Sequence, residues 1–347
     1  MMNLAPKRCR ITKETTLEEL CVAFNLTKEQ LRKYHNIYCP KQDYIGDGIP
    51  KHVEIIFLPP DEKDLRERIF NPDGGNYILY VSENTLEYNK PYKKRYGIVQ
   101  NVFHNDEHQT KLHYEIELNR TNSKLEIVRL PVYVNDQRPD LMMEQIADKI
   151  GGILYPLVLQ INDNGTIRAV LSNNEIQNRW KQLKPELQDY YEGPIAEGLF
   201  KITEEQLKNA AISLKKIKDS IFYAIFFFPL YDTFNNEKKL TFQMELSIFA
   251  EKPKLLYEVT LVLDPEISKS QKFIIKASGK CIDDKIIEEI ENGEQISEGA
   301  KVIESHFNFI YKLNTKDNSI FSIYGEVEVK LARFNKRITF ECYEQFN

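Results

Sequence analysis

Residues 16–36 read TLEELCVAFNLTKEQLRKYHN, and residues 53–59 read VEIIFLP. The first half of the longer stretch places its apolar residues three and four positions apart, which is the spacing of one helix face. The shorter stretch places apolar residues at alternate positions, as a half-buried strand does. With a β-type run around Ile11, the predicted order is strand, helix, helix, strand.

Two capping boxes mark the starts of the predicted helices. Thr16 is followed three residues later by Glu19, and Thr27 is followed by Gln30. In this pattern the threonine side chain and the later carboxylate or amide satisfy each other's backbone N–H groups at a helix N-terminus. Separate helices are therefore expected to begin at the two threonines.

This order of elements, closed by Leu-Pro, resembles the LysM family. The matching apolar frame consists of Ile11, Thr16, Leu17, Leu20, Phe24, Leu26, Leu31, Leu58 and Pro59. The resemblance implies a small βααβ module that binds the N-acetylglucosamine-containing backbone of peptidoglycan or chitin. The glycan-binding positions that it implies are Glu14, Thr15, Thr16, Asn36 and Tyr44. The family usually has Gly-Asp before the threonine, where this chain has Glu14-Thr15; the alternative is a generic helical hairpin.

At 347 residues the chain is expected to form two or three domains. The polar, Pro- and Gly-containing segment after residue 60 indicates a connector. The predicted division is residues 1–60 as the LysM-like module, 61–75 as a linker, and 76–347 as an α+β domain. Helices are expected near residues 140–150, 173–192, 203–228 and 283–292.

Beyond residue 76 most of the chain alternates apolar and polar residues, which indicates half-buried strands. The clearest hairpin joins residues 155–161 to 166–171, and Asn164-Gly165 is expected to form a type I′ turn. The predicted fold class is α+β: a small βααβ LysM-like N-terminal domain, followed by a larger domain of curved antiparallel β-sheets packed on long helices.

Composition narrows the class of partner and compartment. A net charge of −5, with lysines scattered among glutamates, argues against nucleic acid. The N-terminus has no apolar signal region, and no apolar run is long enough to span a membrane. The five cysteines form no evident disulfide framework. The prediction is a cytoplasmic protein, with delivery by a non-classical secretion route as an alternative.

The sequence contains no recognisable catalytic site and no cofactor-binding motif. His104 and His108 have a spacing that could ligate a metal on a helix, but they lie in a polar run between two predicted strands. A solvated hairpin loop is therefore the preferred interpretation. Cys39 beside His35 or His52 offers no more than a conceivable cysteine–histidine pair.

Aromatic residues suggest one further kind of site. Phe222 and Phe226 lie on one face of a predicted helix, and Trp180 is the single tryptophan of the chain. They could line a hydrophobic pocket in a half-open barrel, although aromatic residues at helical spacing more often form an ordinary core.

Three functions follow as hypotheses. LysM modules on chains without signal peptides resemble accessory proteins of bacterial contractile injection machines, including type VI secretion systems. The leading hypothesis is therefore a non-enzymatic binding and assembly protein that acts as a spike- or baseplate-linked adaptor or is associated with an effector. The alternatives are a peptidoglycan-binding effector or hydrolase, and a half-barrel that binds a hydrophobic ligand.

Overall fold

The structure is a computed structural model, and two compact units make up the chain. One unit comprises residues 1–79 with 344–347, and the other comprises residues 80–343. The residues that the structure describes are 7–12, 14–24, 26–58, 81, 84–88, 90–249, 252–268, 270–283, 303–331 and 335–345. The predicted linker at 61–75 and nearly all of the predicted helix at 283–292 lie outside these residues.

In the part of the small unit that the structure describes, two strands pair beside two helices. Its elements are β1 (Lys7–Arg10), α1 (Leu17–Phe24), α2 (Lys28–Tyr38), the 3-10 helix η1 (Lys41–Asp43) and β2 (Ile55–Leu58). Strands β1 and β2 pair antiparallel. Both expected capping boxes are formed, at Thr16 with Glu19 and at Thr27 with Gln30. The buried core consists of Leu17, Leu20, Leu31, Ile45, Val53, Ile56 and Leu58.

His35 lies at the centre of this small core and is fully buried. Its Nδ1 accepts a hydrogen bond from the Phe57 N–H (3.0 Å), and its Nε2 lies 3.0 Å from the Asp43 carbonyl oxygen. Because one ring nitrogen must accept while the other donates, this geometry requires the neutral imidazole. Burial is the main cause that lowers the His35 pKa, against the opposing effect of the Asp43 carbonyl.

The buried neutral His35 predicts that the small unit loses stability in acid. The folded pKa lies below the unfolded value of about 6.5, so the unfolded chain binds the proton more readily. Stability is therefore retained above pH ~6.5 and lost as the pH falls from there toward the folded pKa. The measurement is the urea midpoint of the NMR amide signals from residues 7–58, followed from about pH 5 to about pH 8, the range in which histidine titrates. The His52→Gln control should show the same loss of stability in acid. The same loss in His35→Gln would contradict its attribution to His35.

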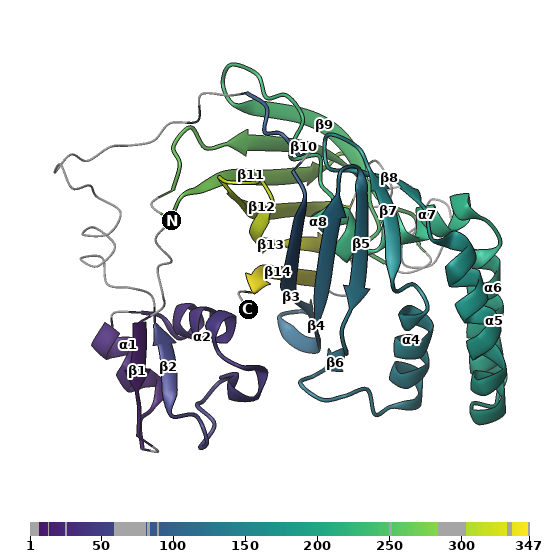
Figure 1. Ribbon diagram of the computed structural model, residues 1–347, viewed down its shortest axis with the longest axis horizontal. Coiled ribbons are helices and arrows are strands. Elements are labelled where there is room, and N and C mark those ends of the chain that lie inside the picture. The colour runs from purple at the N-terminus through teal and green to yellow at the C-terminus, as the bar shows by residue number, and fades with distance from the viewer. Residues whose placement is uncertain are drawn as a thin grey trace. The chain divides into compact units, whose positions relative to one another are not determined.

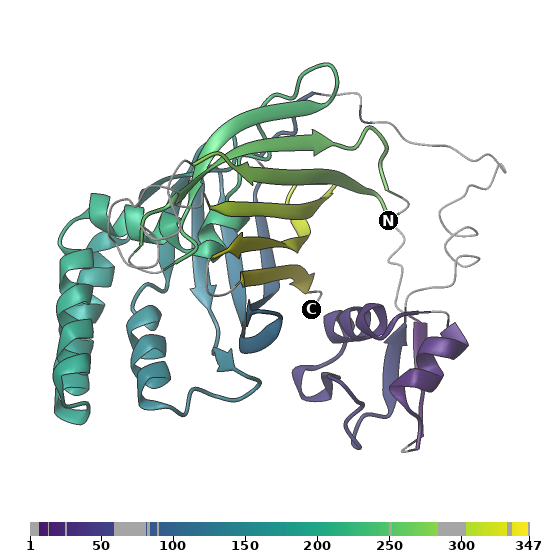
Figure 2. The same ribbon diagram turned by 180° about the vertical axis from the view of Figure 1, so that it is seen from behind.

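The large unit is dominated by one antiparallel sheet of 12 strands among the described residues (Figures 1 and 2). The spatial order is β8-β7-β5-β4-β3-β14-β13-β12-β11-β10-β9, and β6 pairs with β4. The strands are β3 (Tyr92–His104), β4 (Glu107–Thr121), β5 (Lys124–Arg129), β6 (Tyr133–Val134), β7 (Leu157–Ile161), β8 (Ile167–Val170), β9 (Lys239–Leu246), β10 (Leu255–Leu263), β11 (Lys272–Cys281), β12 (Glu304–Asn314), β13 (Ile320–Lys330) and β14 (Asn335–Gln345).

The sheet consists of two meanders that meet at a seam in its interior. The seam lies between β3 and β14, which are the first and the last of its strands along the chain. Neighbouring strands within each meander follow one another along the chain, except that β6 and α4 come between β5 and β7, whereas β3 and β14 are distant in sequence. The Asn105 N–H donates to the Asn335 carbonyl (2.9 Å), and the Asn101 amide donates to Thr339 Oγ1 (3.1 Å). These bonds extend the sheet across the seam.

Among the described residues, five helices accompany the sheet: α4 (Met142–Gly152), α5 (Asn173–Tyr190), α6 (Pro194–Leu207), α7 (Ala210–Asp219) and α8 (Ile221–Phe226). The curved sheet bends around α8 (Figure 1). The sequence predicts a single helix at 203–228, but this region contains three. Asn209 caps the start of α7 by accepting a hydrogen bond from the Ile212 N–H, and Ser220 separates α7 from α8.

The predicted fold class is therefore wrong. The chain is not a LysM-like domain followed by sheets packed on long helices: most of it is one large antiparallel sheet with few helices. The error has a physical origin, because alternation shows which face a strand buries and does not show which strand lies beside it.

The hairpin at 155–171 is confirmed, but its turn is not type I′. Gly165 has φ +91°, whereas Asn164 is not among the residues with positive φ. The Gly165 N–H donates to the Asn162 carbonyl (3.0 Å), and the register shifts between Gln160 and Ile161. A single left-handed glycine beside a register shift matches the hairpin loops that end in a bulge, which require one positive φ rather than two.

Two glycines lie directly opposite phenylalanines on the inner face of the sheet. Gly279 of β11 is opposite Phe307, and Gly325 of β13 is opposite Phe309. A Cβ added at Gly325 would lie 2.0 Å from the Asn308 carbonyl oxygen. The missing side chains thus leave room for rings that cover the glycine backbone.

Candidate functional site

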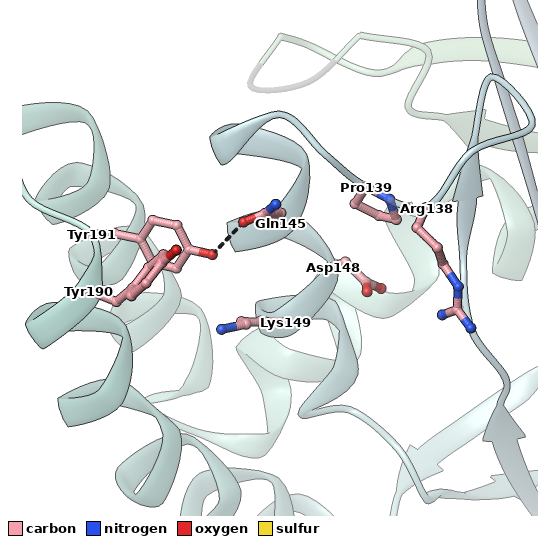
Figure 3. Close-up of a pocket in the computed structure, with 7 residues that line it drawn as sticks. All are labelled: Arg138, Pro139, Gln145, Asp148, Lys149, Tyr190 and Tyr191. Atoms are coloured by element: carbon pink, nitrogen blue, oxygen red, sulfur yellow. Dashed lines mark hydrogen bonds between the residues drawn. The ribbon is translucent and has the colours of Figure 1, made fainter.

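A pocket opens between α4 and the end of α5, with a cavity volume of about 300 Å³ (Figure 3). We call it the α4–α5 pocket. Its lining residues come from the segment after β6, from α4, and from the last turn of α5; they are Arg138, Pro139, Gln145, Asp148, Lys149, Tyr190 and Tyr191.

Helix α4 presents a polar face to this pocket. Gln145 and Lys149 are four residues apart, so their side chains project from the same side of the helix. Ile146 points the other way and is fully buried in the main core. Gln145 and Lys149 therefore point toward the tyrosines at the end of α5, whereas Asp148 points to the other side (Figure 3).

Arg129 fixes the position of Asp148 in the pocket wall. The Arg129 Nη2 lies 2.7 Å from Asp148 Oδ1 and also donates to the Asp148 main-chain carbonyl (3.0 Å). The guanidinium fills the space beside Gly151, where an added Cβ would lie 3.1 Å from Nη1. The Asp148 charge is thus neutralised by a half-buried arginine.

Arg138 extends a column of stacked side chains. Its guanidinium carbon lies 4.9 Å from the centre of the Tyr133 ring, and that ring stacks on His113 with centroids 4.8 Å apart. Asn135 and Asp136 turn the chain just before Arg138, with φ of 50° and 67°. The arginine contacts a ring here, which leaves its hydrogen-bonding edge able to meet a ligand.

The tyrosine pair forms the opposite wall. The Tyr191 hydroxyl donates to Gln145 Oε1 at 2.9 Å (Figure 3). Tyr191 is only 4% exposed. Tyr190, in contrast, is 75% exposed. The Lys149 ammonium lies 5.8 Å and 5.5 Å from the two ring centres. One tyrosine therefore ties α5 to α4, while the other presents an open aromatic surface.

Exposed apolar side chains lie close in the sequence to the residues that line the pocket. Met142 precedes Gln145 and Lys149 by three and seven residues, so it continues the face of α4 that lines the pocket. The N-terminal end of α4 and the turn from α5 to α6 lie at the same end of the large unit in both views (Figures 1 and 2). The exposed apolar residues are Leu141 (63% exposed), Met142 (46%), Met143 (41%) and Ile195 (63%); we call them the apolar rim.

This arrangement suits binding rather than bond making. Two cations, an exposed aromatic ring and an apolar rim can hold an anionic group beside an apolar one. Within the part of the chain that the structure describes, no three His, Cys, Asp or Glu side chains converge as a metal site. In those residues, too, no helix has the length and apolar character to cross a membrane.

The glycan-binding positions implied by the resemblance lie around α1 and α2. Asn36 uses its amide to hold a loop: its Oδ1 accepts from the Ile45 N–H (2.9 Å), and its Nδ2 donates to the Ile45 carbonyl (3.0 Å). Thr15 Oγ1 accepts from the Thr12 N–H (3.1 Å). Glu14 is exposed. Asn36 and Thr15 thus take part in local structure.

A second hollow of about 190 Å³ lies in the small unit, but it is not lined by these positions. Thr16 caps α1, and Tyr44 ends the short helix η1. The hollow is lined instead by Leu17, Lys28, Glu29, Arg32, Gly46 and Asp47. This hollow is thus lined by other residues, and glycan binding at the five predicted positions stays a prediction.

His104 and His108 lie on a β-hairpin and not on a helix. The turn between β3 and β4 uses Asn105 and Asp106, both with positive φ, as the hairpin-loop interpretation expects. His108 Nε2 lies 3.3 Å from Asn101 Oδ1, and its ring packs edge-on against Phe103. The metal hypothesis required His104 and His108 to lie one turn apart on a helix, and the hairpin does not provide this arrangement.

The predicted hydrophobic-pocket residues are packed among other rings. Phe222 and Phe226 are 3% and 2% exposed, with ring centres 5.4 Å apart, and Phe226 meets Tyr96 edge-on at 5.5 Å. Trp180 is 4% exposed and its ring lies 6.2 Å from that of Phe200 in α6. These contacts are those of a core; a hydrophobic ligand there stays a prediction.

Sequence reasoning missed the α4–α5 pocket because its residues are dispersed along the chain. A signal was present in Leu141-Met142-Met143, since three consecutive apolar residues cannot all face the core from one helix. The adjacent pair Tyr190-Tyr191 carries the same information, because neighbouring residues on a helix end point in different directions.

Comparisons with known proteins add no family. No family model and no curated protein matches the chain, so no LysM domain is recognised. A solved structure concerning lipid–protein interactions in lipovitellin is similar, with a TM-score of 0.41 and 9% identity. The match covers 74% of this chain and 25% of that one, so this chain spans about a quarter of that protein.

Proposed function

We propose that this chain is a non-enzymatic binding and assembly protein that docks a protein partner on the α4–α5 pocket. The occupant is a segment of the partner that carries a carboxylate beside an apolar side chain. The observation that carries the proposal is the apolar rim of exposed leucine, isoleucine and methionines together with Arg138 and Lys149.

Charge favours an acidic segment. Asp148 is already paired with Arg129, whereas Arg138 and Lys149 contact tyrosine rings. Lys149 points toward the tyrosine pair and Arg138 lies on the other side of α4 (Figure 3), so a carboxylate entering the pocket would meet one of these two cations. Tyrosine, methionine and arginine are also the residue types enriched in protein interfaces.

The pocket wall is held in place before a partner arrives. The hydrogen bond from Tyr191 to Gln145 ties α5 to α4, and Arg129 ties α4 to the sheet through Asp148. Ordering side chains on binding costs free energy, so a wall that is already ordered favours affinity. The larger assembly predicted for the partner, a bacterial contractile secretion system, stays a prediction, as does glycan binding.

A displayed library of random peptides, selected on the purified full chain, tests this proposal. We expect enriched peptides to combine an acidic residue with a large apolar one. For one enriched synthetic peptide, one of the variants Arg138→Glu and Lys149→Glu should weaken binding roughly tenfold or more, because a charge-assisted hydrogen bond becomes a repulsion. Fluorescence anisotropy gives the dissociation constants.

Matched controls separate this surface from general effects of charge or polarity. Lys181→Glu makes the same reversal at an exposed site on α5 that does not line the pocket. Met142→Ser should weaken binding, whereas Ile310→Ser, which alters a 41% exposed residue on β12, should not. Enriched peptides without acidic residues, or binding that both Arg138→Glu and Lys149→Glu leave unchanged, would rule out the proposal.

A further inference from the structure

The two ends of the large sheet differ in how they finish. At one end β8 has four residues, and α7 packs beside it. At the other end β9 has eight residues and pairs with β10 on one side. In the sheet of the described residues no strand follows β9. An open edge of this length is a template for a further strand.

The backbone alternation shows which groups of β9 face this open side. The Lys239 carbonyl accepts from the Asn235 N–H, and thus points away from β10. The preceding Lys238 carbonyl accepts from the Leu263 N–H at the end of β10. Because the direction alternates along a strand, Thr241, Gln243 and Glu245 present their N–H and C=O groups to the open edge.

The side chains of β9 do not block this edge. Natural edge strands are commonly protected by charges or proline; β9 carries charges only near its ends, at Lys239 and Glu245, and residues 241–244 between them read Thr-Phe-Gln-Met. On the inner face, Leu240, Phe242 and Met244 are only half-buried. Their cross-strand partners on β10 are fully buried; these are Leu261, Val259 and Tyr257. The apolar face therefore thins out at β9, where a further strand would cover it.

We propose that β9 pairs with β9 of a second copy of this chain, antiparallel and centred on Phe242. In this register Lys239 lies opposite Glu245 of the other copy, and Thr241 lies opposite Gln243. Phe242 faces its own counterpart. Each opposite-charge pair occurs twice, because a two-fold axis repeats every contact. The half-buried Leu240 and Met244 also become neighbours on the inner face.

The register follows from the strand itself. Moving it by one residue would turn the inner side chains of one copy to the outer face of the other. Moving it by two residues places Lys239 opposite Gln243 or opposite Ser247, and the charge pairing is lost. With Phe242 at the centre, Thr241 and Gln243 form the hydrogen-bonded pair, as their outward backbone groups require.

Sedimentation equilibrium of the full chain tests the dimer, and charge exchange tests its register. We expect the native chain to dimerise, and Lys239→Glu or Glu245→Lys to lower the association constant about tenfold each, since like charges then face one another at two places. The double variant Lys239→Glu/Glu245→Lys should recover most of the lost association. Lys93→Glu, on the interior strand β3, is the control that should not alter it.

Cysteine crosslinking gives an independent measurement of the same register. Hydrogen-bonded cross-strand pairs have Cα atoms about 5.5 Å apart, which suits a disulfide. Mixing copies with Thr241→Cys and copies with Gln243→Cys should yield a 241–243 disulfide, located by mass spectrometry, and neither variant alone should crosslink at this site. A monomer at every concentration, or a dimer indifferent to both charge reversals and without this crosslink, would overturn the proposal.

Discussion

Replacing Gly325 by alanine is expected to lower the stability of the large unit by about 3 kcal/mol or more. An added Cβ would lie 2.0 Å from the Asn308 carbonyl oxygen and 2.6 Å from the Phe309 Cα, and both atoms belong to the adjacent backbone. Side-chain rotation cannot relieve such a contact, so the strands β12 and β13 would have to move apart. Urea unfolding followed by the fluorescence of Trp180, which is buried in the same core, measures the loss.

Two other glycines provide graded controls. At Gly279 the nearest atoms belong to the Phe307 ring, at 2.1 Å and 2.3 Å, and a ring can turn where a backbone cannot. Gly279→Ala should therefore cost less than Gly325→Ala. Gly198 lies within α6 with nothing within 4 Å of the added atom, so Gly198→Ala should raise stability by about 0.5–1 kcal/mol. An unchanged urea midpoint for Gly325→Ala would contradict the packing described here.

The second large effect is expected in the small unit, where His35→Ala should cause unfolding. The substitution removes a fully buried ring and leaves the Phe57 N–H and the Asp43 carbonyl without their partner. A cavity in place of a buried side chain costs about 2–5 kcal/mol, and each orphaned backbone group adds about 1–3 kcal/mol. A core of this size has little stability to lose.

Amide exchange of the full-length variant distinguishes this outcome from a general effect. Residues 7–58 should lose protection in His35→Ala, while residues of β3 to β14 keep it and the Trp180 transition stays in place. His52→Ala is the matched control, because His52 is largely exposed with its Nε2 near the Gln42 carbonyl. Protection of Phe57 that survives the loss of His35 would show that the imidazole is not the central support.

Sequence alone could locate many strands and turns. Antiparallel strands with one buried face alternate, and this pattern predicts β10 and β12 closely. Alternation carries no information about neighbours, so the pairing of β3 with β14 could not be seen. The break at Asn209 was also hidden: α6 and α7, on either side of it, both bury apolar residues in the main core, so the apolar pattern continues through the break.

The candidate site was harder to predict than the fold. Arg138 and Tyr190 are far apart in the sequence and line one pocket because α5 returns beside α4. The five implied glycan-binding positions came from a resemblance, and Asn36 illustrates why residue type was insufficient. Its amide holds the backbone of Ile45. An asparagine with this structural role and an asparagine that contacts a ligand look the same in a sequence.

The seam between β3 and β14 has a consequence for synthesis on the ribosome. The strands of each meander can pair in the order in which they emerge, but β3 must wait for a strand made more than two hundred residues later. Throughout that interval the β3 edge is unpaired and open to other nascent chains. Translation speed and chaperone access over residues 105–335 should therefore influence the yield of folded protein more than the intrinsic speed of any single hairpin.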